Sequence, residues 1–268
     1  MATDYTQSVN CMGAWLFTEG SGTTVADASG EGNTANFKAS GEPVWDVDVP
    51  SGYSNNSVNF DGSNDYVLLS GGEGTSLDAA LLDEWSFCLW GLVDNATAEH
   101  KFGGYWTNDG GEDGGAEYLL SIGTDMKPFA AFKNTNGDYY VPTSTTALSQ
   151  DTWYHFCITF KRNTVGGAKI YVDGVEVASA NTGDFAIYNA NDANVVIGGG
   201  VDTGVTIIQP FDGQMTEVAM FNTELTQTQI QEIMDFGLDG SLDVATTKFR
   251  KTFSSIGTGT GKRQMVGT

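Results

Sequence analysis

Short runs of alternating apolar and polar residues recur along the chain, with turn-forming residues between them. This alternation is typical of strands that rest one face on a core. Asp173-Gly174 stands between two such runs and predicts a two-residue type I′ hairpin. The predicted strands include residues 12–17, 57–60, 65–70, 85–93, 117–122, 128–133, 152–161, 168–172, 175–179, 194–198 and 214–221.

One stretch, residues 226–236, has the apolar spacing of a helix. Thr226 and Gln229 have the spacing of a capping box, and Gly237 is a natural residue to end the helix. Many short strands followed by a single short helix predict an all-β domain. We therefore expect residues 1–238 to form a two-sheet antiparallel β-sandwich with one C-terminal helix.

Residues 239–268 are rich in Gly, Ser and Thr and lack periodicity, so they predict a flexible, extended arm. The chain has 12 basic and 34 acidic residues, for a net charge of −22. Residues 1–238 hold 7 of the basic and 32 of the acidic side chains, so the arm is basic where the body is acidic. The arm's basic residues, which we expect to anchor it, are Lys248, Arg250, Lys251, Lys262 and Arg263.

The acidic balance argues against two kinds of partner. A strongly negative domain repels phosphate groups, so we expect neither nucleic acid nor anionic membranes to bind.

No apolar run reaches the roughly 20 residues that span a bilayer. Residues 1–10 have neither a basic nor an apolar stretch, which predicts no signal peptide and synthesis in a cytoplasm.

The three cysteines, Cys11, Cys88 and Cys157, each stand inside an apolar run. Their odd number and wide spacing argue against a disulfide framework. We expect all three to be unpaired, buried side chains, which is compatible with folding in a reducing cytosol.

Five segments, in order, resemble the laminin-G-like branch of the concanavalin A-like lectin/glucanase superfamily. They are GAWLFTEGSGTTVADASGEGN (13–33), VNFDGSNDYVLL (58–69), WSFCLWGLV (85–93), LSQDTWYHFCITFKRNTVGGAKIYVDGVEVASA (148–180) and, within 195–233, VVIGGG followed by FDGQMTEVAMFNTELTQTQIQEI. The resemblance implies a jelly roll of two antiparallel sheets, used in glycan-binding, adhesive or virion-surface roles. The aromatic residues we expect in the core between the sheets are Trp15, Phe17, Trp85, Phe87 and Trp153.

The superfamily includes glycosidases, and a retaining glycosidase needs two carboxyl groups about 5–5.5 Å apart. The family signature Glu-x-Asp-x-x-Glu does not occur in this sequence. The acids fall in turns and glycine-rich loops, where we expect no pKa to be raised by burial. His155 lies in a predicted strand between two aromatic residues and is expected to be structural. The sequence therefore predicts that the protein is not an enzyme.

The resemblance also implies a structural calcium ion. The candidate ligands are Asp27 and Asn33 in the loop 27–33, together with Glu217, which matches the family's acidic position. Thr216 stands where the family often has Asp, which removes one charge. Capping of the turn by the loop residues is the alternative.

The segment 105–117, YWTNDGGEDGGAE, is the most distinctive local feature of the chain. An exposed aromatic ring stacks on a sugar, and nearby carboxylates accept hydrogen bonds from its hydroxyl groups. The adjacent tyrosines 139 and 140 are similar candidates, because one of two neighbouring strand residues must face outward. The candidate glycan-binding residues are Tyr105, Trp106, Asp109, Asp113, Tyr139 and Tyr140. The alternative is a solvated loop between strands with buried aromatic residues.

These observations favour a non-catalytic recognition module whose ligand is a glycan or a protein surface. We expect it on a virion surface, as a phage capsid decoration or fibre-like protein, with residues 239–268 docked on a capsid or coat protein. One alternative is a bacterial surface or secreted carbohydrate-binding domain, which would act outside or on a cell. Another is a purely structural coat protein without a ligand. The sequence leaves the oligomeric state open.

Overall fold

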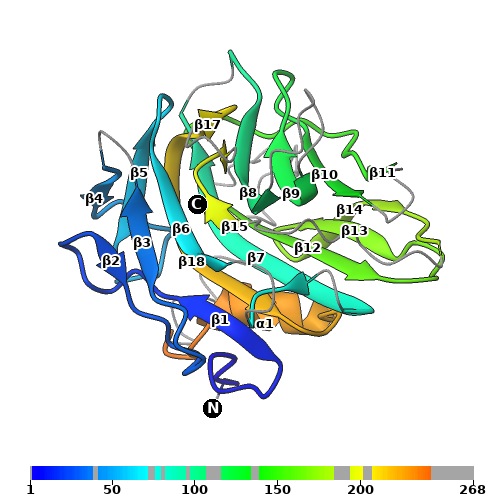
Figure 1. Cartoon of the computed structure of the whole chain (residues 1–268), viewed down its shortest axis with the longest axis horizontal. Helices are drawn as coiled ribbons and strands as arrows, with labels where there is room; N and C mark the ends of the chain where they lie inside the picture. Colours follow the sequence, from blue (N-terminus) through cyan, green and yellow to red (C-terminus); the bar gives the residue numbers. More distant parts are fainter. Residues whose placement is uncertain are drawn as a thin grey trace, which may run out of the picture.

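The computed structural model describes residues 2–38, 42–71, 76–79, 82–94, 97–106, 116–133, 139–183, 194–201 and 207–242. These residues form two antiparallel sheets, A and B, packed face to face, and one helix (Figure 1). The arrangement confirms the predicted all-β sandwich. Among the described residues, no helix is long and apolar enough to cross a membrane.

Sheet A has the strand order β14-β13-β12-β7-β18-β5-β4, and β1 also pairs with β18. Its strands are β1 (Cys11–Trp15), β4 (Val44–Asp46), β5 (Ser57–Asp61), β7 (Glu84–Val93), β12 (Tyr154–Lys161), β13 (Ala168–Val172), β14 (Val175–Ala180) and β18 (Asp212–Phe221).

Sheet B has the order β11-β10-β9-β8-β15-β6-β3-β2. Its strands are β2 (Thr24–Val25), β3 (Ala35–Lys38), β6 (Tyr66–Gly71), β8 (His100–Trp106), β9 (Ala116–Ile122), β10 (Pro128–Lys133), β11 (Tyr139–Tyr140) and β15 (Asn194–Ile197). A separate two-stranded ribbon joins β16 (Gly200–Val201) to β17 (Ile207–Ile208).

Alternate side chains of β7 point to opposite faces of sheet A and pack into two different cores. Trp85 and Phe87 pack into the large core between the sheets, whereas Cys88 belongs to a second cluster on the outer face of sheet A. Of the five aromatic residues expected between the sheets, four are fully buried there: Trp15, Phe17, Trp85 and Phe87. The prediction for Trp153 is wrong, because this residue precedes β12, is half-buried and belongs to neither core.

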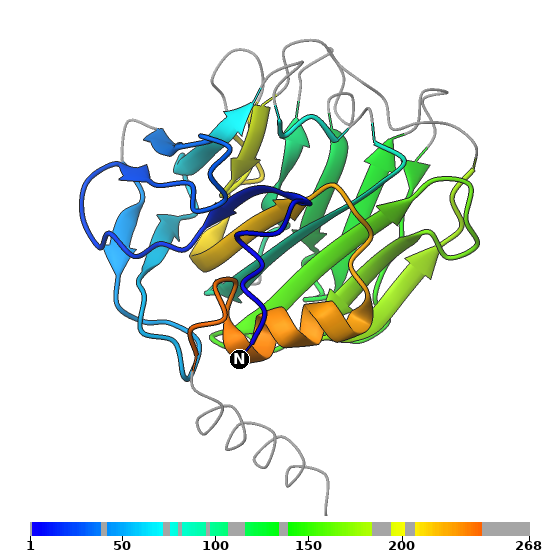
Figure 2. The same cartoon turned by 90° about the horizontal axis from the view of Figure 1, so that it is seen from below.

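Helix α1 (Gln227–Phe236) covers the second cluster. Thr226 and Gln229 form both hydrogen bonds of the predicted capping box, and Gly237 ends the helix with a φ of 78°. Ile230 and Ile233 face the outer side of sheet A. Figure 2 shows α1 lying across one end of this sheet, beside the N-terminal segment.

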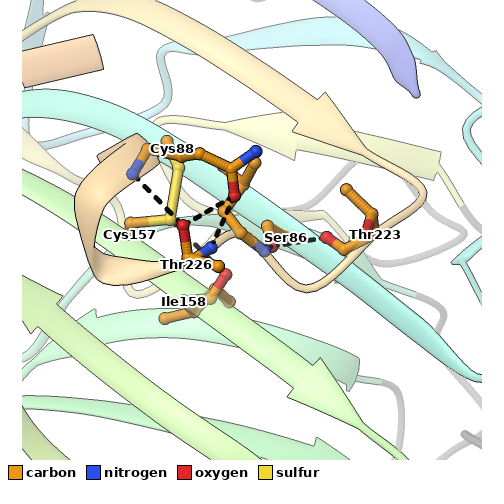
Figure 3. The surroundings of a disulfide bond; sticks show 8 residues. Ser86, Cys88, Cys157, Ile158, Thr223 and Thr226 are labelled. Atoms are coloured by element: carbon orange, nitrogen blue, oxygen red, sulfur yellow. Dashed lines mark hydrogen bonds between the residues drawn. A yellow bond between two sulfur atoms is a disulfide. The ribbon is translucent and has the colours of Figure 1, made fainter. Parts of the chain in front are cut away.

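Cys88 and Cys157 form a disulfide, so the prediction that all three cysteines are unpaired is wrong for two of them. The two residues stand directly opposite each other on β7 and β12, with Cα atoms 4.1 Å apart. Figure 3 shows the disulfide close to Ser86, whose hydroxyl group donates to the carbonyl of Thr223 at 2.7 Å. Cys11 is free and lies in the same buried cluster.

The chain enters and leaves the sandwich at neighbouring points. The N–H of Tyr5 donates to the carbonyl of Leu238 at 2.8 Å. A Cβ atom built on Gly240 would lie 2.9 Å from the carbonyl oxygen of Thr3. Residues 3–5 and 238–240 therefore run in contact, and Tyr5 and Leu238 both belong to the cluster on the outer face of sheet A.

Candidate functional site

A bulge in β18 directs the carboxyl group of Glu217 away from the core between the sheets. Glu217 and Val218 together stand opposite a single residue of β7. The extra residue lets Met215 and Val218, three positions apart, both pack between the sheets. Glu217 has a φ of 52°, a left-handed conformation that is strained for a residue with a side chain. Such strain is found where the surrounding structure holds a side chain in one particular place.

Hydrogen bonds fix the carboxyl group of Glu217 in that place. Its Oε2 accepts from the N–H of Leu238 at 3.0 Å, and its Oε1 accepts from Nδ2 of Asn55 at 3.2 Å. Asn55 Nδ2 also donates to the carbonyl of Leu16 at 2.7 Å. Asn55 Oδ1 is buried and accepts no hydrogen bond from any described residue. An unpaired buried amide oxygen costs stability.

The Glu217 pocket encloses about 140 Å³ between four segments of the chain. A Cβ atom built on Gly237 would lie 3.5 Å from Oδ1 of Asp239 and 3.8 Å from Oε2 of Glu217. The glycine therefore leaves open the space between the two carboxyl groups. The lining residues are Leu16, Thr18, Tyr53, Ser54, Asn55, Glu217, Gly237, Asp239, Ser241 and Leu242.

Burial raises the pKa of Glu217 to about 8; the N–H of Leu238 lowers this pKa and the charge of Asp239 raises it. Burial likewise raises the pKa of Asp65 to about 6. The expectation that no acid has a pKa raised by burial is therefore wrong. The physical reason is tertiary: the bulge in β18 and the turn after α1 together bury the carboxyl group of Glu217.

The loop 27–33 satisfies its own hydrogen bonds. Oδ1 of Asp27 accepts from the N–H of Ala14 at 3.0 Å and from both the N–H and the hydroxyl group of Ser29. Oδ2 accepts from the N–H of Asn33 at 2.9 Å. These bonds are those of a capped turn, and they share no partner with the bonds of Glu217. The structure therefore does not join the three candidate calcium ligands through direct contacts.

Across the described parts of the chain, no group of three or more His, Cys, Asp or Glu side chains gathers to hold a metal ion. The Glu217 pocket offers a different pair of groups, the carboxyl groups of Glu217 and Asp239. Carboxylate oxygens are hard donors of the kind that calcium prefers. The pocket is open beside these two carboxyl groups, whereas the oxygens of Asp27 accept the hydrogen bonds of their own turn.

The outer face of sheet B carries a small apolar cluster. Leu119 and Ala131 are buried there, and the half-buried rings of Phe129 and Tyr139 pack against them. Tyr140 lies on the opposite face, where it packs against the core between the sheets. Of the two adjacent candidate tyrosines, Tyr139 is therefore the one on the outer face.

Two of the other glycan-binding candidates, Tyr105 and Trp106, stand on another strand of sheet B. Tyr105 and Trp106 are the last residues of β8, which neighbours β9 and lies three strands from the strand of Tyr139. The side chains of Tyr105 and Trp106, and all of Asp109 and Asp113, lie outside the described residues. The five basic residues of the arm, Lys248, Arg250, Lys251, Lys262 and Arg263, also lie outside them.

His155 occupies the position of a packed strand residue. It is buried on the outer side of β12, and its ring meets the ring of Trp90 edge-on at 5.3 Å between centroids. The backbone N–H of His155 donates to Oδ1 of Asp173 at 2.9 Å. These contacts agree with a structural role for this histidine.

The chain belongs to the concanavalin A-like lectin/glucanases superfamily, because the model of a laminin-G-like family in it matches residues 61–231. One similar solved structure is Trypanosoma rangeli sialidase in complex with 2,3-difluoro-KDN, with 16% identity, a TM-score of 0.59, and coverage of 85% of this chain and 32% of the sialidase. Another is the receptor binding domain of botulinum neurotoxin C/D mosaic serotype, with 17% identity and a TM-score of 0.59. The match covers 84% of this chain and 51% of the neurotoxin chain.

At such low identities, these likenesses show the fold alone. The chain spans about a third of the sialidase chain and about half of the neurotoxin chain. The two neighbours comprise an enzyme and a receptor-binding domain, so the shared fold does not itself decide between catalysis and binding. The search of curated proteins found no match to this chain.

The residues of these two sites that were not predicted from the sequence include Asn55, Asp239 and Phe129. A signal for the pocket does exist in the sequence. Met215 and Val218 are both apolar but three positions apart in one strand, which breaks the period of two and indicates a bulge at the residues between them. No comparable signal marks Asn55, because its role depends on a loop packing across sheet A.

Proposed function

We propose that this chain is a non-catalytic recognition domain that binds glycans on the outer face of sheet B, near the ends of β8 to β11. The observation that carries the proposal is the pair of half-buried rings, Phe129 and Tyr139, set on Leu119 and Ala131. Aromatic rings that keep one side accessible offer flat apolar area to a ligand, and strands hold them rigidly.

The outer face of sheet A is less suited to recognition. Helix α1 and the N-terminal segment cover it, and the second core, including the disulfide, is buried beneath them. The membership of the lectin/glucanase superfamily supports a glycan as the ligand class. So does the sialidase neighbour, which was solved in complex with 2,3-difluoro-KDN.

The proposal of a non-catalytic role rests on the small volume of the pocket that the buried carboxyl group of Glu217 faces. The buried acid Glu217 faces a pocket of about 140 Å³, whereas sites for small organic ligands are typically about 300–1,000 Å³. We assign this pocket to a structural calcium ion, which would supply positive charge to the buried carboxyl groups. Glu217 and Asp239 would hold it.

For the biological setting, we propose display on a phage particle, as a capsid decoration or fibre-like protein. The opposite charges of the body and of residues 239–268 support a role of the arm as the anchor on a capsid or coat protein. A protein shortened after Leu242 is then expected to lose particle binding and to keep glycan binding. Equal particle binding by the shortened and full-length proteins would refute the anchor.

A glycan-array screen tests the recognition surface, with Tyr139→Ala and Phe129→Ala beside the wild type. Loss of about 1.4 kcal/mol of stacking would weaken binding about tenfold in each variant. Val44→Ala is the control, because Val44 is exposed on β4 of sheet A. A wild type that binds no glycan would refute the proposal and favour a purely structural coat protein.

A further inference from the structure

We infer that the glycan bound on sheet B is an extended chain of several sugars that lies along β10, and that Val141 forms the middle of its binding surface. The inference rests on the proposed glycan-binding function. It deepens that function by naming the shape of the ligand and a further contact residue. Recognition of a single terminal sugar at one aromatic ring is thereby excluded.

The chain after β11 continues alongside β10 with a constant register. Tyr139 stands opposite Lys133 at one end of β10, and Thr143 stands opposite Phe129 near the other end. Residues 139–143 therefore extend the outer face of sheet B beyond the two residues of β11.

The same register places Val141 opposite Ala131, midway between the two ends. Val141 is 48% exposed, whereas Pro142 beside it is buried, so the side chain of Val141 faces outward. On its other side, Ala131 stands opposite Leu119 of β9. A row of three apolar side chains without aromatic rings thus crosses the middle of this face.

We call Phe129, Ala131, Val141 and Tyr139 the apolar strip. Its two rings stand at opposite ends, because Phe129 and Lys133, the partner of Tyr139, are four residues apart on β10. Four residues of an antiparallel strand span about 14 Å. That length is much greater than one sugar ring, so a sugar on Phe129 does not reach Tyr139. A chain of sugars parallel to β10 contacts both rings and passes over Val141.

The size and composition of the apolar strip favour a carbohydrate over a protein partner. Stable protein interfaces typically use about 20–30 residues on each side, whereas the strip has four. Its ends adjoin groups that hydrogen-bond to sugar hydroxyls: the exposed Thr143 beside Phe129, and Lys133 beside Tyr139. Apolar area with a few polar groups is the usual composition of a small-ligand site.

Isothermal titration calorimetry of the full-length protein tests the length of the ligand. The probes are size fractions, from monosaccharide to hexasaccharide, of the polysaccharide that binds most tightly in the glycan array. The hexasaccharide is expected to bind with a stoichiometry of one. It is also expected to bind at least about 100-fold more tightly than the monosaccharide, because linked contacts to two rings act together.

Val141→Asp tests the middle of the apolar strip. It is expected to weaken hexasaccharide binding about tenfold, because a sugar chain over Val141 strips water from an unpaired carboxylate. Monosaccharide binding at either ring is expected to stay unchanged. Val44→Asp is the matched control, since Val44 is an exposed valine on the edge strand β4 of sheet A.

Three results would overturn the inference while leaving glycan binding intact. They are equal affinity for the monosaccharide and the hexasaccharide, a stoichiometry of two for the hexasaccharide, and hexasaccharide binding by Val141→Asp as tight as by Val44→Asp. A stoichiometry of two would mean that each ring holds its own molecule. Wild-type protein that binds no glycan in the array would overturn the proposed function and the inference together.

Discussion

Removing the disulfide between Cys88 and Cys157 is predicted to cost the sandwich a large part of its stability. The two cysteines are separated by 69 positions in the sequence. Closing a loop of that length lowers the entropy of the unfolded chain, and the chain-entropy relation gives a stabilisation of about 4 kcal/mol at 25 °C. Whole domains are typically stable by only about 5–15 kcal/mol, so the Cys88→Ala/Cys157→Ala variant is expected to be marginally folded.

Urea unfolding followed by tryptophan fluorescence measures this loss, with the free energy of unfolding extrapolated to water. Cys11→Ala is the matched control, because Cys11 lies in the same buried cluster but closes no loop. Reductant is expected to destabilise the wild type and Cys11→Ala and to leave the double variant unchanged. Three free thiols in protein purified without reductant, or a loss below about 1 kcal/mol, would refute the reasoning.

Two further predictions concern local features. Asp65 has a pKa raised to about 6 by burial, above an ordinary value of about 3.9. The unfolded chain therefore loses this proton first, so stability falls as pH rises through the window from about 4 to 6, by about 3 kcal/mol for this group. Asp65→Asn is expected to be more stable than the wild type at pH 7 and equal to it below pH 4 in urea titrations; equal stability at both pH values would contradict this. Thr226→Ala removes the capping box of α1 and is expected to cost about 1 kcal/mol, measured by thermal unfolding. An unchanged melting temperature would show that packing on sheet A, rather than the cap, sets the start of the helix.

The parts of the fold that depend on local chemistry were predictable from the sequence. The hairpin at Asp173-Gly174 has the two positive φ angles, 48° and 71°, that a type I′ turn requires. The cap of α1 was equally predictable, because all its contacts lie within one turn of the chain. In such places a few neighbouring residues determine the conformation.

Strand β8 was not predicted, because Gly103 and Gly104 interrupt its apolar pattern. Both glycines are in fact required by packing. A Cβ atom at Gly103 would lie 2.5 Å from the carbonyl oxygen of Val196, and one at Gly104 would lie 2.2 Å from that of Tyr118. The need for a residue without a side chain arises from neighbouring strands, so the sequence of β8 alone resembles a loop.

The candidate sites were harder to predict than the fold, because they depend on register. The pairing of Cys88 with Cys157 requires that β7 and β12 be adjacent and aligned at one residue. The burial of Glu217 requires a one-residue bulge and a turn after a distant helix. Each depends on contacts between residues far apart in the chain, which periodicity does not report.

The contact between residues 3–5 and 238–240 also has a mechanical consequence. A force that pulls these two points apart acts on the bond from Tyr5 to Leu238 and on its few neighbours, and not along the strands of either sheet. Under load, this contact is expected to open before the sandwich does, and the load path never crosses the outer face of sheet B. Because entry and exit adjoin, the same body could also be inserted into a surface loop of another protein with little distortion of its host.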